Sequence, residues 1–230
     1  MRVAIIPARG GSKRIPKKNI KNFLGKPIIS YSIDAAKKSN LFEKIIVSTD
    51  DHEISNIAIK YGAEVPFFRP KEIADDHSGI HSVIKHAIEW LEDSGNKIDY
   101  ACCIYATAPT IRAADIIHGY EIIKSGKWES VIAATNFPYP IYRSFKELPN
   151  SGLEMIFPEH YSTRSQDLPE TYHDAGQFYW ALPDFIKGKP KRFSQKNSIV
   201  KLPYYMVQDI DSNEDWKRAE ILYEMLNKTD

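Results

Sequence analysis

The sequence predicts an α/β protein with a mainly parallel sheet covered by helices, and three observations describe its organisation. Short apolar, β-rich runs alternate along the chain with stretches whose apolar residues recur at helical spacing. The 230 residues are enough for one domain with a substantial core. Ser212 and Asp215 have the spacing of a capping box, which predicts where the last helix begins.

The elements follow from these patterns in chain order. We expect strands at Val3–Ile6, Lys44–Ser48, Ala101–Tyr105, Ser130–Ala134, Gly176–Leu182 and Tyr204–Ile210. We expect helices at Ile28–Lys38, Asp51–Tyr61, Gly79–Leu91, Ala114–Lys124 and about Asn213–Leu226.

The stretch 137–170 interrupts the alternation of strands and helices. It contains too many prolines for a regular βα unit: Pro138, Pro140, Pro149, Pro158 and Pro169. We interpret it as an excursion from the sheet, either a lid or an arm that packs on a second subunit. A disordered linker is the alternative, but the segment is more aromatic and apolar than disorder favours.

Composition restricts the class of protein. Thirty-one basic side chains balance thirty acidic ones, which argues against a globally basic nucleic-acid binder. Strand-like residues from position 2 and the lack of a long apolar run predict a cytoplasmic protein without a signal peptide or membrane span. Cys102 and Cys103 are neighbours in a predicted strand and point to opposite faces, so we expect buried, reduced thiols and no zinc site.

The N-terminal loop is the first candidate site. Gly10, Gly11 and Ser12 follow the first strand among the cations Arg9, Lys13, Arg14, Lys17, Lys18 and Lys21, and no acidic residue precedes Asp34. Close backbone approach and positive charge suit a polyphosphate, and ligands bind at the carboxyl ends of strands in such sheets. A solvated basic loop is the alternative. The pattern is neither a P-loop nor a dinucleotide fingerprint.

The second candidate site is Asp209 and Asp211. If the segment is extended, both carboxylates project from one face, with Cα atoms roughly 7 Å apart, and can share a cation. Magnesium that also binds substrate phosphates fits such a pair. The alternative is that Asp211 helps to cap the following helix.

Other acidic and histidine residues give weaker signals. Asp50 ends a predicted strand on the expected binding edge, whereas Asp75 and Asp76 have the character of turn residues. His77 and His81 share a helix face, but a zinc site there would lack an obvious third ligand.

Four motifs together resemble the cytidylyltransferases that activate sialic-acid-like sugars. They are Pro7-Ala-Arg-Gly-Gly-Ser-Lys13, Pro16-Lys-Lys-Asn-Ile20, Val47-Ser-Thr-Asp50 and Asp209-Ile-Asp-Ser-Asn-Glu-Asp-Trp216. The resemblance spans essentially the whole chain. It implies a single Rossmann-like nucleotidyltransferase domain over residues 1–230, with a protruding dimerisation arm at about 137–170, and hence a homodimer.

The resemblance also implies roles for residues at the nucleotide end. Arg9, Ser12 and Lys13 would bind the triphosphate with help from Lys18, and Asn19 would contact the cytidine. Asp209 and Asp211 would hold magnesium, and Arg9, Lys13 and Asp211 would be the catalytic residues. The full expected nucleotide site is Ala8, Arg9, Gly10, Gly11, Ser12, Lys13, Lys18, Asn19 and Asp50.

The chain departs from the sialic acid enzymes at the sugar end. Tyr105 replaces their sugar-binding glutamine, and His173 stands where an arginine is expected. The segment 157–180 instead resembles the pseudaminic acid branch of the family. A sugar carboxylate needs cationic or hydrogen-bonding partners. The expected sugar site is Tyr105, Arg143, Arg164, His173 and Gln177.

These features predict that the hydroxyl of a nine-carbon 2-keto sugar acid, pseudaminic acid, attacks CTP and releases pyrophosphate. N-acetylneuraminic and legionaminic acid are the alternative sugars. The proton acceptor stays open between Asp211 and a metal-bound water. Less favoured classes are a glycosyltransferase, which also uses an Asp-x-Asp motif, and a salt-sensitive RNA binder; we expect no nucleic-acid or membrane partner.

Overall fold

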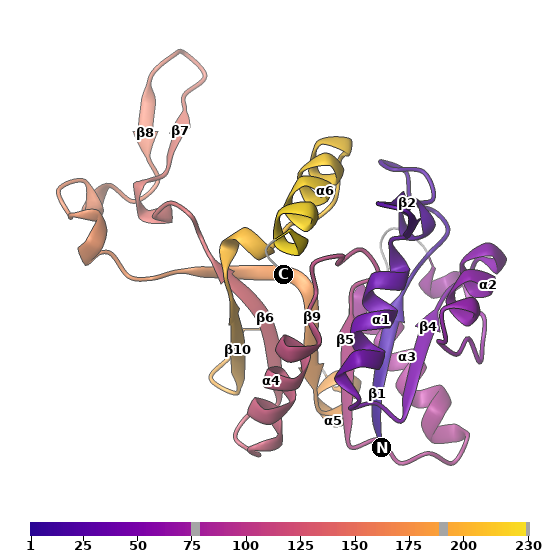
Figure 1. The fold of residues 1–230 in the computed structure, drawn as a ribbon. Helices are drawn as coiled ribbons and strands as arrows, with labels where there is room; N and C mark the ends of the chain where they lie inside the picture. Colours follow the sequence, from indigo (N-terminus) through magenta and orange to yellow (C-terminus); the bar gives the residue numbers. More distant parts are fainter. Residues whose placement is uncertain (75–78, 189–192, 229–230) are drawn as a thin grey trace.

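The central sheet of the computed structural model carries the predicted alternation of strands and helices. The structure describes residues 1–74, 79–188 and 193–228, and within them a six-stranded sheet has the order β10-β6-β9-β5-β1-β4 (Figure 1). Its strands are β1 (Arg2–Pro7), β4 (Lys44–Ser48), β5 (Tyr100–Ile104), β6 (Ser130–Asn136), β9 (Tyr172–Ala181) and β10 (Asn197–Leu202).

Most neighbouring strands run parallel, which confirms the predicted fold class. β1 pairs in parallel with β4 and β5, and β10 pairs in parallel with β6. β9 lies antiparallel between β5 and β6. Parallel strands bring their carboxyl ends to one edge, so the loops after β1 and β4 meet there.

One strand prediction near the C-terminus was wrong, and one strand was missed. The strand expected at Tyr204–Ile210 is replaced by a 3-10 turn, Tyr204–Met206, followed by irregular backbone. The edge strand is β10 instead, which ends at Leu202 before Pro203, a residue without an N–H for continued pairing. The sequence of β10 mixes Lys, Asn and Ser with its apolar residues, which hid its strand character.

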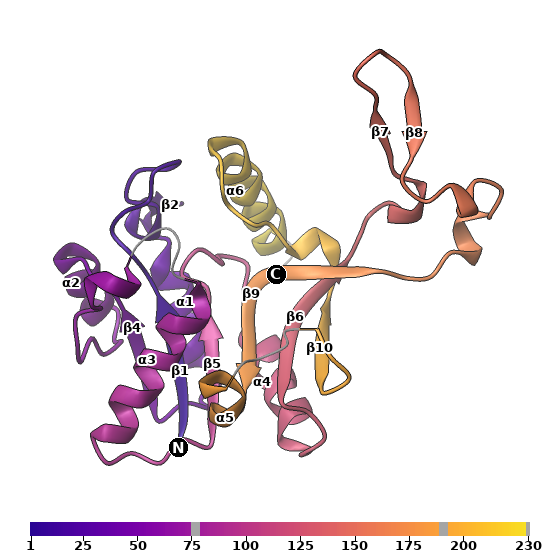
Figure 2. The same ribbon diagram turned by 180° about the vertical axis from the view of Figure 1, so that it is seen from behind.

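The helices cover both faces of the sheet (Figures 1 and 2). Residues of α1, α2 and α4 share one buried cluster with Ala4 and Ile6 of β1, while residues of α3 and α5 share another with Val3 and Ile5. The bounds are α1 (Ile29–Ser39), α2 (His52–Lys60), α3 (Ile80–Asp93), α4 (Ala113–Lys124), α5 (Pro183–Lys187) and α6 (Asn213–Asn227). The short α5 was not predicted. No helix in the described ranges is both long and apolar enough to cross a membrane.

The two cysteines confirm the alternation of side chains along β5. Cys102 belongs to the cluster under α1 and α4, and Cys103 belongs to the cluster under α3. Both are buried free thiols, and burial raises the pKa of Cys102 well above its usual value.

A separate buried cluster joins the N-terminal loop to the C-terminal helix. Ile15 and Phe23, which follow β1, pack with Ile210 and with Trp216 of α6. The capping box predicted for α6 is confirmed: the Ser212 hydroxyl accepts from the Asp215 N–H, and the Asp215 carboxylate accepts from the Ser212 N–H. This packing brings the loop after β1 and the segment before α6 to the same edge of the sheet.

The segment between β6 and β9 leaves the sheet and projects from it (Figures 1 and 2). Its β7 (Phe145–Glu147) and β8 (Leu153–Met155) form an antiparallel pair, and 3-10 turns lie at Ile141–Arg143, Pro158–His160 and Ser165–Asp167. We call residues 137–171 the arm. The returning strand β9 bulges opposite Ile132–Ala134, where Gly176 has a φ of 62° that favours glycine.

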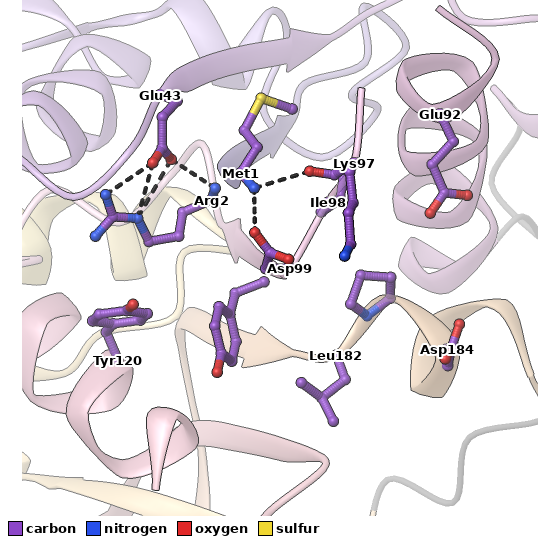
Figure 3. A pocket seen from close by; sticks show the side chains of 12 residues that line it. Met1, Arg2, Glu43, Glu92, Lys97, Ile98, Asp99, Tyr120, Leu182 and Asp184 are labelled. Carbon is purple, nitrogen blue, oxygen red and sulfur yellow. Dashed lines mark hydrogen bonds and ion pairs between the residues drawn. The ribbon is translucent and has the colours of Figure 1, made fainter. Parts of the chain in front are cut away.

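The opposite edge of the sheet, where β1 and β5 begin, is held by charge pairs around a pocket of about 710 Å3 (Figure 3). The N-terminal ammonium donates to the Asp99 carboxylate and to the Lys97 carbonyl. Arg2 donates to Glu43 from its guanidinium at 2.9 Å and from its backbone N–H at 2.6 Å. These hydrogen bonds lower the pKa of the Glu43 carboxyl to about 2.

Replacing Glu43 by Gln should therefore change the acid dependence of stability. A carboxyl whose folded-state pKa is depressed contributes stability above its unfolded-state value near 4.5 and loses it as the pH falls toward about 2. We expect Glu43→Gln to lower the free energy of unfolding at neutral pH by about 0.5–1 kcal/mol, as for solvent-exposed pairs. Urea unfolding should show this difference shrinking below about pH 4.5.

An Arg2→Gln background supplies the control for this measurement. Without the guanidinium, the effect of Glu43→Gln should lose most of its pH dependence. A difference between wild type and Glu43→Gln that stays constant down to pH 2 would contradict the assignment.

Candidate active site

The loop after β1 is held against the end of β4 by its backbone. The N–H of Ala8 donates to the Ser48 carbonyl at 2.9 Å, and the N–H of Gly10 donates to the Asp50 carboxylate at 3.0 Å. The Asn19 amide donates to the Arg9 carbonyl at 2.9 Å. Asp50 and Asn19, both predicted to bind nucleotide, thus fix the shape of the loop.

The two glycines of the loop differ in their surroundings. A Cβ on Gly10 would lie 2.6 Å from the Asp51 carboxylate, which itself caps α2 by accepting from the N–H groups of Glu53 and Ile54. A Cβ on Gly11 would meet no described atom within 4 Å. Gly10 therefore permits close packing inside the protein, whereas the backbone at Gly11 faces open space.

A cavity of about 580 Å3 lies beside this loop. Its walls bring together residues predicted at both ends of the site: Tyr105 for the sugar and, for the nucleotide, Arg9, Ser12, Lys13, Lys18 and Asn19. The cavity opens where β1 and β5 end, which is the edge that the sequence predicted for ligand binding. A strongly cationic wall of this kind suits an anionic ligand.

Arg69 is a residue of this cavity that the sequence analysis missed. It is buried; its Nε donates to the Ser48 hydroxyl at 3.2 Å, and its Nη2 donates to the Ser48 carbonyl. Burial lowers the pKa of its guanidinium to about 10, which keeps it charged at neutral pH. An isolated Arg before Pro70 gave no signal, because its place depends on the bridge between Thr49 and Phe68.

The carboxylate pair meets the cationic loop from the C-terminal side. Lys18 Nζ donates to the Ile210 carbonyl at 2.6 Å and lies 3.4 Å from Asp211 Oδ1, while Arg14 Nη2 donates to the same oxygen at 2.7 Å. The helix cap is Ser212, and the Asp211 N–H is bonded to Asp215, so the Asp211 carboxylate points to the loop instead of capping α6. The segment is irregular and not a strand end, as reported above.

Asp209 and Asp211 could supply two carboxylate ligands to a cation. The described residues contain no group of three or more His, Cys, Asp or Glu side chains arranged for a metal. Magnesium commonly uses one or two carboxylates and completes its shell with phosphate and water, so two aspartates fit it when a nucleotide is bound. Desolvation raises the pKa of Asp209 above its usual value, and the charge of Asp211 raises it further. A divalent cation would relieve this repulsion.

Two residues predicted for the sugar lie on β9 close to its bulge. His173 Nδ1 lies 2.9 Å from the Asp174 carbonyl, and its ring packs against Phe137. Gln177 is buried; its amide donates to the Met206 carbonyl at 3.0 Å, and its Oε1 has no hydrogen-bond partner among the described residues. Their role toward a sugar stays a prediction.

The remaining predicted sugar residues, Arg143 and Arg164, lie on the arm. Arg143 donates to the Thr163 carbonyl, and Arg164 pairs with Asp167 at 2.7 Å, so both have partners within the arm. The arm projects away from the loop after β1 (Figure 2), and the structure does not bring these arginines to the walls of the cavity. Asp75, Asp76 and His77 lie outside the described residues.

Alanine at each loop glycine should separate their roles. Gly10→Ala should lower the free energy of unfolding by about 1–3 kcal/mol, the usual cost of overpacking, because Asp51 cannot move without uncapping α2. It should also weaken CTP binding. The matched control Gly11→Ala should change stability by less than about 0.5 kcal/mol. Urea unfolding and CTP titration check both, and equal losses would contradict the difference in packing.

Comparisons with known proteins show which family the chain is similar to. A sequence model of the family described as cytidylyltransferase matches residues 3–137, more than half of the chain. A pseudaminic acid cytidylyltransferase of Campylobacter jejuni is 44% identical over 97% of this chain and 96% of its own length. A CMP-N,N'-diacetyllegionaminic acid synthase of Legionella pneumophila is 33% identical over 97% and 96%, respectively.

The fold has a counterpart among solved structures. CMP:2-keto-3-deoxy-manno-octonic acid synthetase in complex with CTP has a TM-score of 0.72 over 98% of this chain and 99% of its own. Its 14% sequence identity makes this a likeness of fold. The family match includes the cationic loop, and the relatives extend over the carboxylate pair as well. The chain belongs to the cytidylyltransferase family.

Proposed function

We propose that this protein transfers the cytidylyl group of CTP to pseudaminic acid and releases pyrophosphate. The observation that carries the proposal is the meeting of the cationic loop with the Asp209–Asp211 pair beside one cavity. The sugar follows from 44% identity along nearly the whole chain to a protein named for pseudaminic acid.

The nucleotide end of the cavity supplies the charge that a triphosphate requires. Arg9, Lys13 and Lys18 line it together with the buried Arg69. Arg69 is held in place by Ser48 before any ligand arrives, so little reorganisation is needed when negative charge enters. Arg9 and Lys13 stabilise the phosphates and the departing pyrophosphate, as predicted from the family motif.

The reaction is a substitution at phosphorus. The anomeric hydroxyl oxygen of the sugar acid forms a bond to the α-phosphorus, and the bond from that phosphorus to the oxygen that bridges it to the β-phosphate breaks, which releases pyrophosphate. The hydroxyl proton passes to a base, for which Asp211 is the candidate on this chain. Positioning and charge neutralisation provide most of the catalysis. Magnesium held by Asp209 and Asp211 would neutralise phosphate charge and lower the pKa of the attacking hydroxyl.

The sugar end differs from that of the sialic acid enzymes at Tyr105 and His173. Tyr105 lines the same cavity as the cationic loop, which supports the proposal that it contacts the acceptor sugar. Legionaminic acid is the second candidate, because a relative named for that sugar is 33% identical over most of the chain. A reaction that consumes CTP is expected in the cytoplasm.

An assay of pyrophosphate release tests the function and the sugar together. With CTP and magnesium, pseudaminic acid should give the highest kcat/KM in a panel that includes N-acetylneuraminic and legionaminic acid. UTP in place of CTP is the nucleotide control. Release of free nucleotide instead of pyrophosphate would indicate a glycosyltransferase, and a preference for another sugar of the panel would overturn the choice of pseudaminic acid.

We also propose that two copies associate through the arm. The arm exposes Tyr139, Phe145, Leu153 and Tyr161 to solvent, and monomeric proteins rarely leave such a group of large apolar side chains uncovered. Phe145 and Leu153 lie on the paired strands β7 and β8, so a second arm can cover them together.

Charged residues on the arm should weaken this association. A Phe145→Glu, Leu153→Glu double variant should raise the dimer dissociation constant at least about 30-fold, the effect of losing about 2 kcal/mol at an interface. Ile221→Glu is the matched control, because Ile221 is equally exposed but lies on α6. Sedimentation measures the dissociation constant, and a monomeric wild type or an unaffected double variant would contradict the proposal.

A further inference from the structure

Arg14 makes a contact that neither the family motifs nor the proposed reaction explains. Its side chain is 70% exposed, yet its guanidinium donates to Asp211 Oδ1 at 2.7 Å across 197 positions of sequence. Arg14 also lines the cationic cavity with Arg9 and Lys13. One guanidinium therefore lies between the carboxylate pair and the space expected to hold the triphosphate.

Buried packing positions this exposed contact. Ile15, next to Arg14, and Ile210, next to Asp211, are both fully buried in the cluster that joins the loop to α6. Lys18, bonded to the Ile210 carbonyl, fixes the same alignment from the side. The apolar side chains thus place Arg14 opposite Asp211, although the ion pair itself gains little energy in water.

Arg14 differs in this respect from the neighbouring cation of the loop. Lys17 has a side chain of similar exposure, but it pairs with Glu53 at the start of α2. Lys18 lies closer to the Ile210 carbonyl than to Asp211, and its side chain is only 19% exposed. Arg14 is consequently a solvent-accessible loop cation in hydrogen-bond contact with a carboxylate predicted to bind metal.

A guanidinium and a divalent cation on the same carboxylate oppose each other. Both groups are positive. When both contact the same carboxylate they repel each other, so binding of the cation favours release of the guanidinium. We propose that Arg14 is a gate on the metal site: it occupies Asp211 in the empty protein, yields that carboxylate to the metal, and then turns into the cavity toward the triphosphate. This inference rests on the proposed function. With this gate, binding of the metal strengthens binding of the nucleotide, and binding of the nucleotide strengthens binding of the metal.

Binding of Mn2+, a paramagnetic substitute for magnesium, tests the gate without catalysis. In the full chain free of nucleotide, Arg14→Gln should bind Mn2+ about two- to fivefold more tightly than wild type, as expected from losing one exposed ion pair. Electron paramagnetic resonance of free Mn2+ measures this directly. A variant with damaged structure would lose affinity, so a gain separates gating from a purely structural role.

Lys17→Gln is the matched control, because it removes the same charge from the same loop without touching Asp211. Its Mn2+ affinity should stay close to that of wild type. An equal gain in Mn2+ affinity in both variants would show that net charge alone causes the effect, and this would overturn the gate. Unchanged Mn2+ affinity in Arg14→Gln would also overturn it.

Nucleotide and Asp211 variants complete the experiment. The factor by which CTP tightens Mn2+ binding should be smaller in Arg14→Gln than in wild type, since the released guanidinium no longer reaches the triphosphate; an equal factor would overturn the coupling. Asp211→Asn should abolish tight Mn2+ binding. If Asp211→Asn abolishes tight Mn2+ binding but Arg14→Gln leaves the Mn2+ affinity unchanged, only the gate is overturned. If Asp211→Asn still binds Mn2+ tightly, the assignment of Asp211 as a metal ligand is overturned as well.

Discussion

The candidate site depends on the buried apolar cluster that contains Ile15 and Ile210. Both side chains are fully buried, and each adjoins a charged residue of the site: Arg14 on the loop and Asp211 at the C-terminal turn. The hydrophobic effect is non-directional, but here the alignment of two apolar residues fixes which charges face each other. Ion pairs as exposed as that of Arg14 could not by themselves hold the loop after β1 against the segment before α6.

The sheet supplies the rigid base for this cluster. The loop after β1 is bonded to the end of β4 through Ser48 and Asp50, which ties the loop to the sheet. The bulge of β9 turns the chain toward the arm, and a Cβ on Gly176 would lie 3.6 Å from the Asp209 carboxyl carbon. Asp209 therefore lies against the bulge of β9, the strand that returns from the arm to the sheet. Charge pairs around Arg2 stabilise the opposite edge of the sheet, where β1 and β5 begin, away from the candidate site.

Several features could be predicted because they depend on neighbouring residues. The capping box of α6, the alternation of Cys102 and Cys103 and the early helices each follow from local periodicity or local hydrogen bonds. The strand expected at Tyr204–Ile210 failed because its apolar and aromatic residues wind into a 3-10 turn after Pro203. The edge strand β10 was missed because its pairing with β6, and not its composition, makes it a strand.

The sequence by itself determined the α/β class, the cationic loop, the carboxylate pair and the family, since these are written in short patterns of residue type. Only the tertiary structure decided how they are used. In the folded protein the Gly10 N–H donates to Asp50, and Arg69 is buried in the cavity wall. The Asp211 carboxylate accepts from Arg14 instead of capping the helix. Such partners lie tens to nearly two hundred residues apart, and packing of the intervening elements, which no local pattern records, selects them.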